Sequence, residues 1–398
     1  MTVEDLKPSC EQDVVNLVTQ AIEDGAPLRI KGGGTRQGLG RASQQARTLD
    51  MSSISGITLY EPSEMVIGAW AGTSVAEVQK TLDAKGQMLT FEPVDHRVLL
   101  GTDGEPTIGA VVAGNISGPR RLYGGAARDS LIGVRFVNGR GELVKNGGRV
   151  MKNVTGLDLV KLQAGAWGTL GVLTEVIFKV LPKPELVQTL VLENLDDKVG
   201  VDALCAACGT PYEVTGAAHL PASDNQSSRT LMRIEGLENS VRYRAGELAT
   251  AMSHFGETYM IEGDVQSELW QQVCDCEILA EPREKAVWKV SVQPTNGPKF
   301  VERVKSEFSI NHYYDWSGGL VWLSVDAQSN GDAGAELIHK TAQDLGGHAM
   351  LVRGNEELRS RIAVFSPQPA PIAHLSAGIK NSFDPDHLIN PGLMVAEG

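Results

Sequence analysis

RIKGGGTRQG, residues 29–38, places three consecutive glycines directly after a short apolar segment, Leu28 to Lys31, that we expect to form a β-strand. Glycine has no Cβ, so a run of glycines lets backbone N–H groups approach an anion closely. The run therefore favours a loop that binds phosphate. A tight turn without a ligand is the alternative, because glycine is common in turns of every kind.

Two common phosphate-binding loops do not match this run. The Walker loop needs a Lys-Ser or Lys-Thr pair after its last glycine, but Gly34 is followed by Thr35-Arg36-Gln37. The dinucleotide fingerprint Gly-x-Gly-x-x-Gly needs a third glycine where Gln37 stands. A phosphate-binding loop at this position would therefore have to be of another type than these two.

Length and charge narrow the class of protein. A chain of 398 residues is long enough for two domains. Its net charge is −13 and its basic residues form only short pairs, which disfavours a nucleic-acid partner. The N-terminus has acidic residues where a signal peptide would have basic ones, and no apolar run reaches the length of a membrane span. The cytoplasm is the expected compartment.

The five cysteines include two close pairs, Cys205-x-x-Cys208 and Cys274-x-Cys276. Such pairs can form a zinc or redox site, but the second spacing is unusual and no matching histidine ladder is present. Reduced, buried thiols are the alternative, and we expect no metal. Iron–sulfur spacing of the ferredoxin type is absent.

Local signals place helices and strands in the first half of the chain. A helix is expected over residues 9–25, begun by a capping box at Ser9-x-x-Gln12 and ended by Gly25. The alternating EMVIGAWAG, residues 64–72, predicts a strand, and Ser74-x-x-Glu77 predicts the start of a helix that runs to Lys85. This alternation indicates α/β layering.

A second glycine-rich stretch, TIGAVVAGNISGPRRLYGG, covers residues 107–125 and leaves a strip of backbone with little side-chain bulk. A flat ligand against this strip is one interpretation, and close packing of a helix on a sheet is the other. The strand predicted in GVLTEVIFKVLPKP ends at Pro182-Lys183-Pro184, which we interpret as a domain boundary. Beyond it, the pattern favours an antiparallel sheet with helices on one face, a Pro-rich linker at 366–372 and a last helix from 373 to 383.

Four motifs in order resemble the flavoprotein family of vanillyl-alcohol oxidase and p-cresol methylhydroxylase: the early glycine loop, TIGAVVAGNISG, GTLGVLTEV and the terminal FDPDHLINPG. More narrowly, residues 117–172 resemble the smaller FAD-binding subunit of bacterial glycolate oxidases, as do DWSGGLVWL and GGHAMLVRG in the second half. The resemblance implies an α+β protein. It would have an FAD-binding domain over residues 1–183, a cap domain with an antiparallel sheet over 184–372, and a C-terminal segment, 373–398, that returns to the FAD domain.

The resemblance also implies where FAD would bind. The first loop would wrap the pyrophosphate, the second strip would follow the flavin and ribityl, Gly171 and Val172 would meet the adenine side, and Asn390 would return to the isoalloxazine. The implied FAD-binding residues are Gly32, Gly33, Gly34, Thr35, Gln37, Gly38, Pro93, Thr107, Ile108, Gly109, Gly114, Asn115, Ser117, Gly118, Gly171, Val172 and Asn390. Thr35 stands where covalent members carry a flavin-linking histidine, so the resemblance implies non-covalent FAD.

Three functions stay open. The chain can be the FAD subunit of a complex that oxidises glycolate or another 2-hydroxy acid. Its partners would be a larger catalytic FAD subunit and an iron–sulfur subunit. It would associate with the inner membrane only through these partners. It can be a stand-alone oxidase of a sugar or aldehyde. It can also be a scaffold subunit that binds flavin without catalysing a reaction.

Catalytic residues are not identified by the sequence. His348, Arg353 and Arg361 are the local cluster of the second domain that could supply a base and cations for a carboxylate. The spaced histidines of the larger subunit type are missing from INHYYDW, residues 310–316. The chain alone is therefore expected not to turn over glycolate efficiently.

Overall fold

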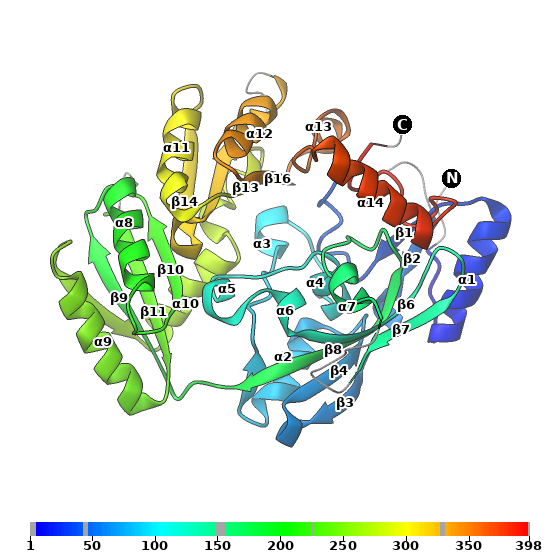
Figure 1. Ribbon diagram of the computed structural model, residues 1–398, viewed down its shortest axis with the longest axis horizontal. Helices are drawn as coiled ribbons and strands as arrows, with labels where there is room; N and C mark the ends of the chain where they lie inside the picture. The colour runs from blue at the N-terminus through cyan, green and yellow to red at the C-terminus, as the bar shows by residue number, and fades with distance from the viewer. Residues whose placement is uncertain (1–4, 43–46, 149–155, 224–225, 327–330, 397–398) are drawn as a thin grey trace.

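The structure is a computed structural model that describes residues 5–42, 47–148, 156–223, 226–326 and 331–396. Part of the stretch 117–172 that carries the narrower resemblance, residues 149–155, lies outside the described residues. Within them, the strands form a small parallel pair and two larger antiparallel sheets. Figure 1 shows the two large sheets side by side, with the first and last parts of the chain meeting at one end.

The first sheet has six strands in the described part of the chain, in the order β3-β4-β8-β6-β7, with β5 paired to β8. Its strands are β3 (Ile57–Glu61), β4 (Val66–Trp70), β5 (Gln87–Leu89), β6 (Leu131–Val137), β7 (Leu143–Gly147) and β8 (Val172–Pro182). All of their pairings are antiparallel. The α/β layering indicated by strand–helix alternation is thus wrong for this sheet, because alternation fixes the order of elements but not the direction in which strands pair.

Seven helices accompany this sheet in the described residues: α1 (Glu11–Asp24), α2 (Val75–Asp83), α3 (Arg97–Leu100), α4 (Ile108–Ala113), α5 (Arg121–Gly124), α6 (Ala127–Ser130) and α7 (Leu159–Gln163). Helices α2 and α4 place Val78, Leu82, Ile108 and Val112 in one core with Phe136 of the sheet. Ser74 caps α2 as predicted, since its hydroxyl accepts the N–H of Glu77.

The predicted capping box at Ser9 is wrong. Helix α1 starts at Glu11, after Cys10, and no side chain caps it. Ser9 instead donates its hydroxyl and its backbone N–H to the carboxylate of Asp13. The far end is as predicted, because Gly25 ends α1 in the left-handed conformation with φ 59°.

Strands β1 (Leu28–Lys31) and β2 (Arg47–Asp50) form the parallel pair. Leu28 and Leu49 lie in a small core with Val14 and Val18 of α1 and with Ile389 near the C-terminus. The backbone also joins these segments, because Leu28 N–H donates to Leu388 O and Asn390 N–H donates to Leu28 O. The C-terminal segment is thereby fixed beside the strand that leads into the glycine loop.

The second sheet has eight strands among the described residues, in the order β12-β9-β11-β10-β14-β15-β13-β16, all antiparallel. Its strands are β9 (Leu186–Glu193), β10 (Val214–Leu220), β11 (Arg229–Gly236), β12 (Thr258–Glu262), β13 (Ala286–Ser291), β14 (Ile310–Asp315), β15 (Leu320–Val325) and β16 (His348–Arg353). We call this sheet and the helices among its strands the cap. The predicted α+β class is confirmed.

One face of the cap sheet packs against α8 (Asp197–Cys208), α9 (Glu238–Met252), α11 (Gly297–Lys305) and α12 (Ala335–Asp344). The prediction of helices on one face is incomplete. Helix α10 (Asp264–Cys274) places Leu269, Trp270 and Val273 in the core of the opposite face, with Leu231 and Trp322. That opposite face is the one turned toward the first sheet, as Cys274 at the end of α10 belongs to the core of the first sheet.

Two short helices follow the cap, α13 (Glu356–Arg361) and α14 (Ala370–Phe383). The Pro-rich segment predicted as a linker over 366–372 ends earlier, because α14 already begins at Ala370. Pro371 is tolerated there because the first turn of a helix does not use its N–H groups.

A cluster of charged side chains connects the segments around the first sheet to the cap. Arg233 of β11 contacts Glu92 at 2.7 Å, and Arg120 contacts Glu235 of β11 at 2.6 Å. The Arg233 and Glu235 side chains are only 4% and 6% exposed. Burial alone would lower the pKa of Arg233, but Glu92 and Glu235 outweigh it and hold that pKa above its ordinary value.

Candidate cofactor site

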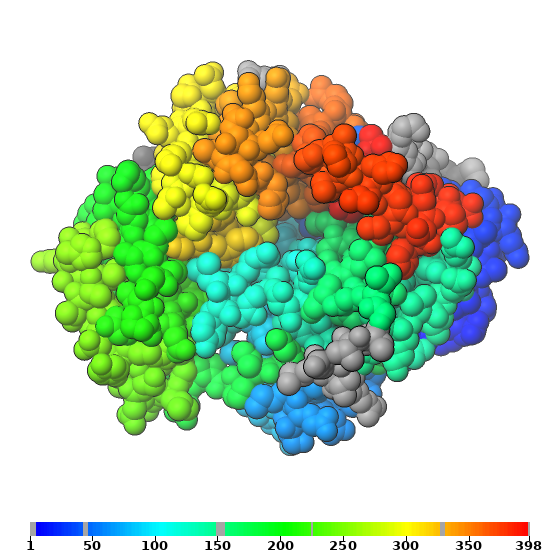
Figure 2. Space-filling model, in the orientation of Figure 1, coloured from blue at the N-terminus to red at the C-terminus, as the bar shows by residue number. Residues whose placement is uncertain are grey.

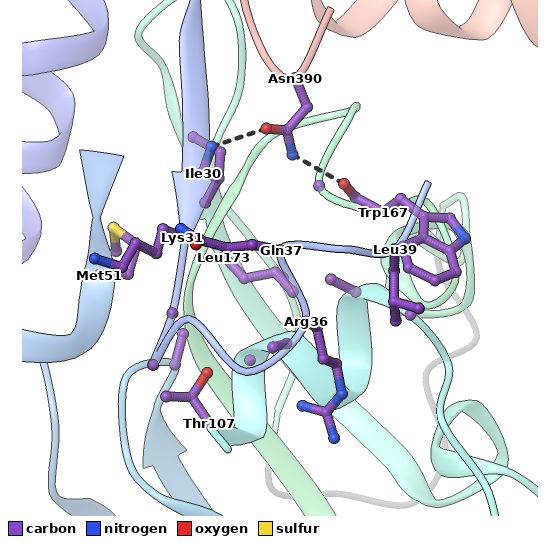
Figure 3. Close-up of a pocket in the computed structure, with 18 of the residues that line it drawn as sticks. Ile30, Lys31, Arg36, Gln37, Leu39, Met51, Thr107, Trp167, Leu173 and Asn390 are labelled. Atoms are coloured by element: carbon purple, nitrogen blue, oxygen red, sulfur yellow. Dashed lines mark hydrogen bonds between the residues drawn. The ribbon is translucent and has the colours of Figure 1, made fainter. Parts of the chain in front are cut away.

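A cavity lies where the glycine loop after β1 meets the start of α4, the loop before β8 and the C-terminal segment. Figure 3 shows these segments converging on it from separate parts of the chain. Its enclosed volume is about 130 Å³, and the cavity opens to solvent at its mouth. Its lining includes Arg29, Gly32, Gly33, Gly34, Thr35, Arg36, Gln37, Thr107, Gly109, Ala110, Gly114, Trp167, Gly168, Gly171 and Asn390.

The glycine loop offers a run of free donors. Within the described chain, none of the backbone N–H groups of residues 33–38 donates a hydrogen bond to a protein acceptor. Such N–H groups lining a cavity form an anion-binding concavity, because together they present several partial positive charges. The loop therefore fits a diphosphate.

Glycine is required in this loop by a close backbone approach. A Cβ on Gly33 would lie 1.8 Å from the carbonyl oxygen of Glu105, and a Cβ on Gly32 would lie 2.2 Å from Thr107 Oγ1. Gly34 has φ +82°, which side chains other than glycine rarely adopt. The loop is thus pressed against residues 104–107, so its shape is set by the protein before any ligand binds.

The second strip begins at Thr107, whose hydroxyl is buried without a hydrogen-bond partner. Gly109 follows, and a Cβ there would lie 2.6 Å from the Cβ of Ala71. The close-packing interpretation is confirmed at Gly109, which packs on Ala71 directly after β4. Ala110 and Gly114 line the cavity, and a ligand against them stays a prediction. An unpaired hydroxyl at the cavity wall is a ready donor for a ligand.

Asn390 holds two walls of the cavity together. Its side-chain oxygen accepts the N–H of Ile30 at 2.8 Å, and its amide nitrogen donates to the carbonyl of Trp167 at 2.9 Å, as Figure 3 shows. Both polar ends of the side chain are therefore occupied by the protein. In this structure Asn390 positions the glycine loop relative to the loop before β8.

Two arginines in the cavity lack acidic partners and were missed by the sequence analysis. The Arg29 guanidinium makes no hydrogen bond or ion pair to described residues, and its Nη1 is buried. Arg36 donates to Val94 O and to His96, while its Nη1 is buried and unpaired. Burial lowers the pKa of Arg36 to about 10, so it stays cationic at neutral pH. The signal that could have identified these two arginines was their position on either side of the glycine run in the sequence.

The structure gathers ten of the implied FAD-binding residues around this cavity: Gly32, Gly33, Gly34, Thr35, Gln37, Thr107, Gly109, Gly114, Gly171 and Asn390. Seven others do not line it: Gly38, Pro93, Ile108, Asn115, Ser117, Gly118 and Val172. Ile108 and Val172 are fully buried in the cores. Gly118 marks the contact with the cap, where its carbonyl accepts Trp316 Nε1 at 3.1 Å. The strip 107–118 therefore runs from the cavity to the cap.

The sequence-predicted cluster of His348, Arg353 and Arg361 is not assembled as one site. Arg353 directs its guanidinium to five carbonyl oxygens, those of Lys285, Leu99, Ala280, Leu279 and Pro282. Arg361 bonds the carbonyl of Gly331. His348 instead has Lys289 and Arg121 as its charged neighbours; burial, then these two cations, lower its pKa.

The cysteine pairs stay apart. Cys205 and Cys208 belong to α8 and Cys274 and Cys276 to the end of α10, on opposite faces of the cap sheet, and all are free thiols. Burial raises the pKa of Cys276 to about 12. Over the described ranges, no group of three or more His, Cys, Asp or Glu side chains could hold a metal ion. Nor does the described part of the chain contain a helix long and apolar enough to span a membrane.

The fold and the cavity fit an FAD-binding protein, and the fold is that of p-cresol methylhydroxylase. Residues 5–147 match the family model described as "FAD binding domain". The structure of p-cresol methylhydroxylase with substrate bound aligns with a TM-score of 0.76 over 99% of this chain and 88% of that one, at 14% identity. Alkyldihydroxyacetonephosphate synthase aligns with a TM-score of 0.70 over 97% and 75%, at 16% identity.

Sequence comparison shows to which family of FAD-binding proteins the chain belongs. The chain is 33% identical to the glycolate oxidase subunit GlcE of Escherichia coli over 97% of both chains. It is 24% identical to the glycolate oxidase subunit GlcD of Bacillus subtilis, over 98% of this chain and 88% of that one. The chain belongs to the family of FAD-dependent oxidoreductases that contains these glycolate oxidase subunits, as the sequence motifs predicted.

Proposed function

We propose that this chain is the FAD-binding subunit of a complex that oxidises glycolate or a similar 2-hydroxy acid. The observation that carries the proposal is the run of unpaired N–H donors at residues 33–37, set in a cavity with Arg29 and the Thr107 hydroxyl unpaired. When bound, FAD would accept the two electrons that leave the substrate. The residues of the glycine loop and of the strip 107–118 would hold it.

FAD is proposed to bind without a covalent bond. Thr35, at the position where the resemblance expects a linking histidine, is 3% exposed and its carbonyl accepts the hydroxyl of Thr102. A threonine offers no imidazole nitrogen for attachment to the flavin ring. Thr35 instead helps to hold the glycine loop to the segment that follows α3.

Partner subunits are proposed because an electron path is needed out of the flavin. No cysteine set of this chain has iron–sulfur spacing, and the two cysteine pairs lie on opposite faces of the cap sheet. Only Cys274 and Cys276 are buried, so the expectation of buried thiols is wrong for Cys10, Cys205 and Cys208. The related chains are named as subunits of glycolate oxidase. We propose the larger FAD subunit and an iron–sulfur subunit as partners, and we propose the division at residues 183/184 and 372/373 as the chain's domains.

The isolated, FAD-loaded chain is expected to be reduced slowly by excess glycolate or D-lactate under anaerobic conditions, and to show no steady turnover. Co-purified partners should allow rapid bleaching and turnover with an electron acceptor. The measurement is the flavin absorbance after anaerobic mixing. A complex containing the Gly33→Val chain, expected to lack this chain's flavin, is the control that assigns the bleached flavin to this subunit.

Two outcomes would contradict the proposal. Rapid bleaching of the isolated chain, followed by reoxidation with a dye, would make it a stand-alone dehydrogenase. Equal bleaching in the complexes with the original and the Gly33→Val chain would make its flavin an idle one.

A further inference from the structure

Lys289 of β13 is a cation without an anion. Its ammonium group makes no hydrogen bond and no ion pair to a described residue, although Asp315 is close enough to act on its pKa, and the residue is half-buried. Its Nζ lies 5.0 Å from the ring centre of Trp316 and 5.6 Å from that of Trp322. Both facts describe an ammonium that contacts two indole rings and has no ion-pair partner.

The surroundings of Lys289 are mostly cationic. The Arg121 guanidinium lies 4.7 Å from the centre of the Trp316 ring, which Lys289 also contacts. It donates a hydrogen bond to Ser117, at the end of the strip 107–118. His348 has Lys289 and Arg121 as its charged neighbours. Burial first, and then Arg121, lower the pKa of Lys289 to about 8, while Asp315, Cys276 and Cys274 act in the opposite sense. The ammonium is therefore still mainly charged at neutral pH.

Lys289 also lies near the end of the proposed cofactor path. The strip 107–118 leaves the cavity and reaches the cap at Gly118, which bonds Trp316. On the other side, Arg36 of the cavity bonds His96, and Lys289 is close enough to lower the pKa of His96, after burial and Arg36. Lys289 thus lies beside Trp322 on the cap sheet, on the face that is turned toward the first sheet.

We propose that Lys289, with Arg121, binds the carboxylate of the substrate between Trp316 and Trp322. A desolvated lysine costs stability unless an anion neutralises it, so an unpaired one is best explained by a ligand. The two indole rings would exclude water and leave room for a small acid. This inference rests on the proposed function, because it assigns a substrate group to the same enzyme.

The test uses oxalate, a small dicarboxylate that cannot be oxidised by hydride loss, and the FAD-loaded chain. Titration is followed by tryptophan fluorescence and by calorimetry. Lys289→Met should weaken oxalate binding about 10- to 100-fold, since a charge-assisted contact is lost. Lys289→Arg, which keeps the charge, should bind within a few-fold of the original chain. Flavin content should be unchanged in both.

A matched control is Lys198→Met on α8, which changes the net charge equally but lies on the opposite face of the cap sheet with a 78% exposed side chain. It should leave oxalate binding unchanged. Thermal unfolding separates a binding role from a structural one. Removing a half-buried ammonium that has no ion-pair partner should leave the unfolding temperature of Lys289→Met equal or higher.

Oxalate binding by Lys289→Met equal to that of the original chain would overturn the inference. If the complex still oxidises glycolate in that case, the proposed function stands without it. If the original chain binds oxalate but the complex never oxidises a 2-hydroxy acid, the carboxylate site stands and the proposed function fails.

Discussion

Replacing Gly33 with valine is expected to leave the purified chain nearly free of flavin. The physical reason is a backbone collision, because a Cβ at this position would lie 1.8 Å from the carbonyl oxygen of Glu105. The loop must move away from residues 104–107, and its N–H groups then lose their arrangement. Overpacking of this kind costs about 1–3 kcal/mol, which lowers ligand affinity about 5- to 150-fold.

The matched control is Gly38→Ala, in the same loop, where a Cβ would meet nothing within 4 Å. That variant should retain its flavin. The measurement is the ratio of flavin to protein absorbance, with circular dichroism to show that the cap remains folded. Equal flavin content in the original and the Gly33→Val chains would mean that the loop is not the cofactor loop.

Arg233→Met is expected to lower the free energy of unfolding by about 3–5 kcal/mol, because it removes a cation from the buried Glu235 and the main cation from Glu92, whose side chain is 26% exposed. Arg233 is 4% exposed, contacts Glu92 at 2.7 Å, and lies 4.6 Å over the Trp270 ring. Burial would raise the pKa of Glu92, but Arg233 and then Arg120 hold it below its ordinary value. Loss of Arg233 leaves that carboxylate with a high desolvation cost.

The control for this variant is Arg242→Met, since Arg242 pairs with Glu238 on the exposed side of α9. Surface pairs contribute little, so its effect should stay within about 0.5 kcal/mol. Urea unfolding of the two variants measures the difference. Adding Glu92→Gln to Arg233→Met should recover part of the loss, because the unpaired charge is removed. Equal destabilisation by the Arg233 and Arg242 variants would show that the buried cluster does not hold the cap.

Local elements were predictable because their signals are local. Strand β1 covers the predicted residues 28–31, and Gly25 ends α1 in the left-handed conformation that glycine tolerates. Ser9 misled the prediction for the opposite reason. Its side chain has two possible partners within one turn, and the Asp13 carboxylate is a stronger acceptor than a backbone group.

Contacts distant in sequence were not predictable. Lys289, Trp316 and Arg121 meet only because the strip 107–118 reaches across to the cap, and no spacing in the sequence records that contact. Arg353 looked available for a substrate because its five carbonyl partners come from segments around residues 99 and 279–285. A sequence shows which residues carry charge, but only the fold shows which charges the protein has already neutralised.

The most direct test of the central claim is an absorption spectrum of the purified chain, recorded before and after acid precipitation. We predict a flavin spectrum in the native sample, and we predict that precipitation releases all of the flavin into the supernatant as FAD, since Thr35 provides no covalent attachment. A colourless chain that does not take up added FAD would contradict the assignment of the cavity, and yellow colour retained by the pellet would contradict non-covalent binding.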